Sequence, residues 1–239
     1  MRCRCLVVSA LVLLLGPALA GAQEKKAALR VCLIADSGEY DAEKSLAGLQ
    51  QYLEKNYPIR CSRAFARSKT DLPGLENLEQ CDVAVLFIRR MELKGEQLER
   101  LKQYCLSGKP LVGIRTASHA IQTWLDLDRE VFGGDYKNHY KAGPEMEVKI
   151  VESARSHPVL RGVQPFLSKG SLYRNANVAK DVEVLLTGSI PEHTEPVAWV
   201  RNYKGGRVFY TSLGHQKDFE EPSFVRLITN ALYWTANKE

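Results

Sequence analysis

Short apolar runs alternate with longer amphipathic stretches through the first half of the chain. This pattern predicts strands at residues 30–36, 59–66, 82–88 and 111–114, and helices at residues 41–56 and 95–106. The run DVAVLFI at 82–88 is apolar almost throughout, as expected of a strand covered on both faces, so we place it at the centre of the sheet. Alternating strands and helices indicate an α/β fold with a parallel sheet and right-handed crossovers.

The pattern changes in the second half. Residues 145–151 alternate like a half-buried strand, and further strands are predicted at 181–188, 196–200 and 206–213, before a closing helix at 222–236. We expect the strands at 181–188 and 196–200 to be antiparallel or to lie at an edge. No linker divides the chain, so residues 23–239 are predicted to form a single domain with a mostly parallel central sheet and antiparallel edge strands.

The first 22 residues have the pattern of an export signal. Two basic residues, Arg2 and Arg4, precede an apolar stretch at 6–15 that is too short to span a bilayer, and small residues follow. We expect cleavage before Gln23, a periplasmic or secreted protein, and no stable membrane insertion after cleavage. The alternative is an uncleaved membrane anchor.

Charge and cysteine content limit the possible binding partners and the possible disulfide bonds. Beyond the predicted signal the chain carries 31 basic and 28 acidic side chains, and the basic residues are scattered, which argues against a nucleic-acid partner. Four cysteines remain, none with Cys-x-x-Cys spacing: Cys32, Cys61, Cys81 and Cys105. In an oxidising compartment they allow up to two disulfides in three connectivities, and the alternative is buried thiols.

The stretch 109–119 is where we expect chemistry. Its apolar strand stops at Ile114, and Thr116 and Ser118 are suited to cap a helix predicted at 117–124. Ligands of open α/β sheets gather at the carboxyl ends of strands. Arg115 at this point suits an anion or a developing oxyanion, and the alternative is an internal ion pair with Asp36 or Asp218.

Three histidines fall at predicted loop ends: His119, His139 and His215. Imidazole can act as a general acid, a general base or a metal ligand near neutral pH. A zinc ion held by these histidines with Asp218 or Asp135 is therefore a candidate cofactor, although no compact zinc motif is present. The alternative is that each histidine forms only local hydrogen bonds.

Aromatic residues near these loops suggest a platform for a sugar ring. The candidates are Tyr136, Tyr140, Tyr173 and Trp124, with burial in the core as the alternative role. A serine nucleophile at Ser118 has little support, because the G-x-S-x-G pattern is absent.

Several ordered motifs resemble the ThuA-like (trehalose-utilisation) family, and particularly its secreted members. They are GIRTASHA at 113–120, FGGDYKNHY at 132–140, HPVLRGV at 157–163, GSLYRN at 170–175 and the long segment 196–219. The resemblance implies a flavodoxin-like three-layer sandwich related to class I glutamine amidotransferases. In those enzymes the elbow holds a nucleophilic cysteine, whereas here Arg115 stands in its place. The resemblance therefore implies no glutaminase activity, and many ThuA-like members carry a histidine at this position.

Together these features predict a secreted protein that processes a sugar, either a disaccharide or a keto-glycoside. We expect His215, aided by Asp218, to move a proton, with His119 or His139 as its complement and Arg115 facing an oxyanion. We expect the ligand to contact four further side chains: Tyr136, Tyr173, Ser118 and Thr116. Isomerase, lyase and hydrolase reactions all remain open, and the alternative is a non-catalytic carbohydrate-binding or scaffold module.

Overall fold

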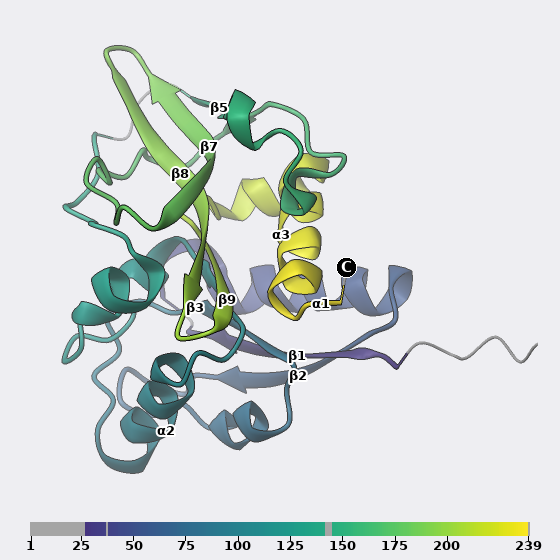
Figure 1. Ribbon diagram of the computed structural model, residues 1–239. Coiled ribbons are helices and arrows are strands. Elements are labelled where there is room, and N and C mark those ends of the chain that lie inside the picture. The colour runs from purple at the N-terminus through teal and green to yellow at the C-terminus, as the bar shows by residue number, and fades with distance from the viewer. Residues whose placement is uncertain (1–26, 37, 142–144, 239) are drawn as a thin grey trace, which may run out of the picture.

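Nine strands form one mixed sheet in the computed structural model, which describes residues 27–36, 38–141 and 145–238 (Figure 1). Their order across the sheet is β2-β1-β3-β4-β9-β8-β7-β5-β6. The strands are β1 (Leu29–Ala35), β2 (Ile59–Phe65), β3 (Val83–Phe87), β4 (Leu111–Ile114), β5 (Met146–Ile150), β6 (Phe166–Ser168), β7 (Val182–Ile190), β8 (His193–Tyr203) and β9 (Gly206–Thr211). The longer helices are α1 (Ala42–Asn56), α2 (Gly95–Leu106) and α3 (Pro222–Thr235).

The sheet has a parallel half and an antiparallel half. β2, β1, β3, β4 and β9 pair in parallel, and β9, β8, β7, β5 and β6 pair antiparallel. The α/β class is confirmed, and the apolar run at 82–88 does form a central, fully buried strand. The antiparallel part is larger than the edge that the sequence predicted.

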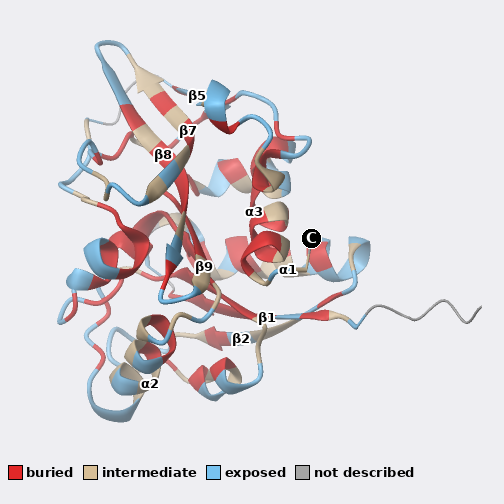
Figure 2. Cartoon of the chain, in the orientation of Figure 1, coloured by how far each residue is buried: buried red, intermediate tan, exposed pale blue. Residues whose placement is uncertain are grey.

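Helices cover both faces of the parallel half. α1 and α3 lie on one side of β1 and β2, and α2 lies on the other (Figure 1). The predicted inner face of α1 is confirmed, because Leu46, Leu49 and Leu53 are buried in the first core. On the opposite side, Leu101 and Tyr104 of α2 pack in a second core. The sheet lies between these two cores, because residues of the same strand, such as Val85 and Leu86, belong to different cores, and its central strands are coloured as buried in Figure 2.

Two expectations about local structure are wrong. The helix predicted at 117–124 does not form; a short 3-10 turn, η3 (Arg115–His119), follows β4 instead. The carbonyl of Ala120 accepts a hydrogen bond from the Met91 N–H, and the Gln122 N–H donates to the Met91 carbonyl, so these groups are not available for helical bonding. The second error is in the strands: the sequence analysis did not predict β6, and β8 is longer than the strand predicted at 196–200.

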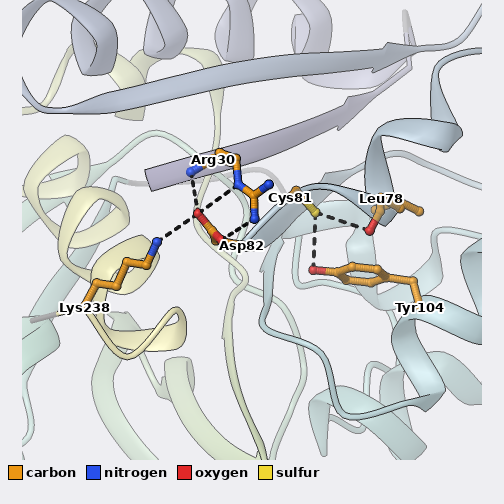
Figure 3. A network of polar contacts seen from close by, with 6 residues as sticks. All are labelled: Arg30, Leu78, Cys81, Asp82, Tyr104 and Lys238. Carbon is orange, nitrogen blue, oxygen red and sulfur yellow. Dashed lines mark hydrogen bonds and ion pairs between the residues drawn. The ribbon is translucent and has the colours of Figure 1, made fainter. Parts of the chain in front are cut away.

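All four described cysteines are free thiols, so the disulfide alternative is not realised in this structure. The Cys81 thiol contacts the Tyr104 hydroxyl at 3.7 Å, next to a network in which Asp82 joins Arg30 and Lys238 (Figure 3). The predicted signal at 1–22 lies outside the described residues. Within the described ranges, none of the helices combines the length and apolarity needed to cross a membrane.

Candidate functional site

The carboxyl ends of the parallel strands bring polar residues to one edge of the sheet. Asp36 follows β1, Arg89 and Arg90 follow β3, Arg115 follows β4, and Ser212 follows β9. The chain leaves β1 towards β2 on one side and leaves β3 towards β4 on the other, so the strand order reverses between β1 and β3. Ligands of open α/β sheets bind in the crevice at such a switch point.

Arg115 is fully enclosed at this edge. It has a left-handed φ of 45°, which turns the chain sharply at the end of β4. Its Nη1 donates to the Ser212 carbonyl at 2.7 Å, and its Nη2 donates to the Tyr40 hydroxyl and to Ser171 Oγ, each at 3.1 Å. The guanidinium carbon lies 4.3 Å from the Tyr40 ring centre and 4.7 Å from that of Tyr173. In this conformation Arg115 affects a ligand through its charge and not by direct contact.

The ion pair considered for Arg115 does not form with Asp36 or Asp218 within the described structure. The Asp218 carboxylate instead accepts hydrogen bonds from Ser168 Oγ at 2.9 Å and from the backbone N–H of Gly214 at 2.8 Å. Burial raises the pKa of Asp36, and one of its buried oxygens has no hydrogen-bond partner among the described residues. Asp36 is therefore a buried acceptor at the edge of the sheet with one oxygen unpaired among the described residues.

A wall of stacked rings stands beside Arg115. The His119 ring lies 4.4 Å from the Tyr136 ring and is nearly parallel to it, at 14°. Tyr173 lies 4.6 Å from Tyr136 and completes the wall. His119 Nδ1 is 3.0 Å from Ser118 Oγ. Burial, followed by the positive charge of Arg90, lowers the pKa of His119 to about 3, so this imidazole is neutral at physiological pH.

His215 lies near Tyr40, its ring edge-on at 6.0 Å. Its Nδ1 accepts the backbone N–H of Lys217 at 3.2 Å, so Nε2 carries the proton in the neutral form. Burial lowers the pKa of this histidine. Asp218 accepts the backbone N–H of His215 at 3.0 Å and so fixes the backbone, whereas the sequence predicted that it would assist the ring.

His139 is exposed at the outer end of the wall. Its ring lies 6.4 Å from that of Tyr173, and its Nδ1 is 2.7 Å from the Tyr140 carbonyl. The three candidate zinc ligands do not form a metal site as predicted. Within the described ranges, no three His, Cys, Asp or Glu side chains come together in a group that could hold a metal ion. Local hydrogen bonds orient each of the three imidazoles separately.

The remaining predicted residues divide into two sets. Thr116 and Ser118 are buried under the wall in η3, and Tyr136 and Tyr173 form it. The other two aromatic candidates lie elsewhere. Trp124 is buried in the core on the α2 side, and the Tyr140 ring stacks on His193 at 4.0 Å.

Sequence reasoning missed Tyr40, Ser171 and the pair Arg89–Arg90. No motif marks these residues. The available signal was the position of the arginine pair directly after the buried run at 82–88.

The fold and this edge define an α/β protein with a candidate ligand site at the carboxyl ends of its parallel strands. A family model described as ThuA, trehalose utilisation, matches residues 30–235, and the chain belongs to this family. No curated protein sequence matches it significantly.

Solved structures share the fold. A ThuA-like protein from Bacteroides uniformis is 19% identical, with a TM-score of 0.68 over 90% of this chain and 94% of its own. A ThuA-like protein from Parabacteroides merdae is 18% identical, with a TM-score of 0.68 over 89% of this chain and 91% of its own. A β-galactosidase from Rahnella sp. R3 is 13% identical, with a TM-score of 0.57 over 89% of this chain and 32% of its own.

Proposed function

We propose that this protein binds a sugar at the carboxyl edge of its sheet and processes it by histidine-based acid–base chemistry. The observation that carries this proposal is the wall formed by His119, Tyr136 and Tyr173 at the carboxyl edge of the sheet, in which His119 and Tyr173 are buried and Tyr136 is the half-buried ring that a ligand would meet. Aromatic faces give the C–H groups of a sugar ring an apolar surface, while the hydroxyls reach nearby polar groups. The unsatisfied oxygen of Asp36 is one such acceptor.

The comparisons support a carbohydrate role. The family is described by trehalose utilisation, and one protein of similar fold is a β-galactosidase. The proposed substrate is a disaccharide or a keto-glycoside, and the reaction is of the isomerase, lyase or hydrolase type. Arg115 occupies the position of the thiol nucleophile in glutamine amidotransferases, so the proposal includes no glutaminase activity.

The proposed acid–base residue is His215. As a neutral ring, it would donate a hydrogen bond to the ligand from Nε2–H, whereas proton transfer from Nε2 would require the imidazolium form, in which Nδ1 no longer accepts the Lys217 N–H. His119, with a pKa of about 3, is a weak base and is better suited to accept or donate a hydrogen bond as a neutral ring. His139 is the remaining candidate for the complementary role. Arg115 would stabilise negative charge from behind the wall without touching the ligand.

Two further parts of the proposal concern the fold type and the location of the protein. The parallel strand order β2-β1-β3-β4-β9 matches the flavodoxin-like order, which supports a flavodoxin-like three-layer sandwich for this half. The basic and apolar pattern of residues 1–22 supports export to the periplasm or the cell exterior.

A substrate screen with matched variants tests the catalytic proposal. The mature protein is incubated with disaccharides and their oxidised forms, and products are followed by NMR. We expect His215→Ala to abolish turnover and His193→Ala, an exposed histidine at the start of β8, to retain it. Turnover unaffected by His215→Ala would exclude the proposed role of this histidine.

A non-catalytic sugar-binding module is the second candidate. It is favoured by one observation: the Nδ1 atoms of His119, His139 and His215 all contact a local protein partner. Binding without turnover, lost in Tyr136→Ala but kept in Tyr52→Ala, would select this candidate. Tyr52 is a matched control because it is an exposed tyrosine on the outer side of α1.

A further inference from the structure

Three arginines lie at the carboxyl ends of β3 and β4, next to the aromatic wall formed by His119, Tyr136 and Tyr173. Arg89 and Arg90 directly follow the buried end of β3, and Arg115 follows β4, the next strand in the sheet. The backbone N–H of Arg90 donates to the His119 carbonyl at 2.9 Å, which fixes the arginine beside the wall. Arg90 has a left-handed φ of 46°, and its side chain is exposed.

The charge of Arg90 has no carboxylate partner in the part of the chain that the structure describes. Asp36 is the acidic residue that follows β1, and it faces two cations, Lys69 and Arg89. Some other surface arginines are paired, including Arg100 with Glu96 and Arg155 with Glu152. The exposed Arg90 side chain is therefore available to a ligand beside the aromatic wall.

After burial, which lowers the pKa of His119 and raises that of Tyr136, the positive charge of Arg90 is the next largest influence on both rings and lowers the pKa of each.

We propose that the sugar bound here carries an anionic group, a carboxylate or a phosphate, which Arg90 holds while the ring lies against Tyr136. A guanidinium offers two parallel N–H donors that match the oxygens of either group. This inference rests on the proposed function, because it needs a sugar at the aromatic wall. It adds the substrate class: sugar acids or sugar phosphates in preference to neutral sugars.

The test compares D-glucuronate, D-glucose 6-phosphate and D-glucose as ligands of the mature protein, by isothermal titration calorimetry at constant ionic strength. We expect at least one anionic sugar to bind about tenfold or more tightly than glucose, equivalent to about 1.4 kcal/mol. The preferred anionic sugar distinguishes carboxylate from phosphate. Raising the salt concentration should weaken its binding and leave that of glucose unchanged.

Three arginine variants locate the effect. Arg90→Gln should reduce the preference for the anionic sugar to within about twofold, and Arg90→Lys, which keeps the charge but loses the paired donors, should retain part of it. Arg60→Gln is the matched control, because Arg60 is an exposed arginine in β2. Circular dichroism confirms that each variant is folded.

Two results would overturn the inference. One is equal affinity of the wild type for all three sugars, or no affinity for any, and the other is an anionic preference that survives Arg90→Gln. Neither result decides the proposed function, which depends on the separate disaccharide screen and on Tyr136→Ala. Absence of both disaccharide binding and turnover in the wild-type protein would instead remove the proposed function.

Discussion

The neutral state of His119 predicts a specific loss of stability at acidic pH. Its folded-state pKa is about 3, against an ordinary value of 6.5. Between these values the unfolded chain binds a proton that the native state refuses, so the free energy of unfolding falls as the pH falls. At about pH 5, which is about 1.5 pH units below 6.5, the loss from this one residue is about 2 kcal/mol relative to pH 8.

Urea unfolding at a series of pH values measures this effect. The wild type is compared with His119→Gln, and tryptophan fluorescence reports unfolding because Trp124, Trp199 and Trp234 are all buried. The difference between the two free energies should change by about 2 kcal/mol from pH 8 to pH 5. His193→Gln, which replaces an exposed histidine, serves as the control and should follow the wild type.

Direct titration checks the same reasoning. The imidazole NMR signals of His119 should stay constant from about pH 8 down to pH 5, where an ordinary histidine would be almost fully protonated. A midpoint near 6.5, or wild-type and His119→Gln stabilities that change in parallel, would refute the neutral, buried histidine. It would also remove the reason for assigning the acid–base role to His215 and not to His119.

Urea unfolding also tests three substitutions elsewhere in the fold. Burial raises the pKa of Asp128 from 3.8 to about 7, so the unfolded chain loses this proton first and the free energy of unfolding falls as the pH rises above 3.8. Asp128→Asn should therefore raise the free energy of unfolding by more than about 1 kcal/mol at pH 8, and by a smaller amount at pH 5. Gly113→Ala would place a Cβ 2.6 Å from the Phe132 ring and should cost about 1–3 kcal/mol. Asp82→Asn weakens ion pairs with Arg30 and Lys238 that are partly exposed, and should cost about 1 kcal/mol or less; a loss above about 3 kcal/mol would contradict this.

The parallel half of the fold was predictable because its signals are local. Each of its strands is a short apolar run, and the helices α1 and α2 carry apolar residues with helical spacing. The ends of these runs also indicated that chemistry would gather near β4. Parallel strands end at one edge, so a correct list of strands is enough to place the residues that follow them, such as Asp36 and Arg115, at the same edge.

Long-range pairing explains the errors. The helix predicted at 117–124 is replaced because Met91, far away in sequence, forms backbone hydrogen bonds on both sides of Ile121. β6 has three residues and exists through its pairing with β5. Neither contact has a signal in the sequence nearby. Tyr40 was missed for a similar reason, because its role depends on the Arg115 guanidinium that lies over its ring.

The contacts of Arg115 in the structure differ from the role that its position in the sequence suggested. An arginine directly after a strand at the carboxyl edge of the sheet suggests a side chain that binds an anion directly. In the structure, however, the Arg115 guanidinium is enclosed between the rings of Tyr40 and Tyr173. Burying a cation is costly unless hydrogen bonds compensate. Those to Ser212, Tyr40 and Ser171 satisfy Nη1 and Nη2, whereas Nε has no hydrogen-bond partner among the described residues. The charge itself is not cancelled by a carboxylate at ion-pair distance among the described residues. In a region of low dielectric constant its field extends to the wall, so Arg115 would set the potential there and the exposed Arg90 would make the contact.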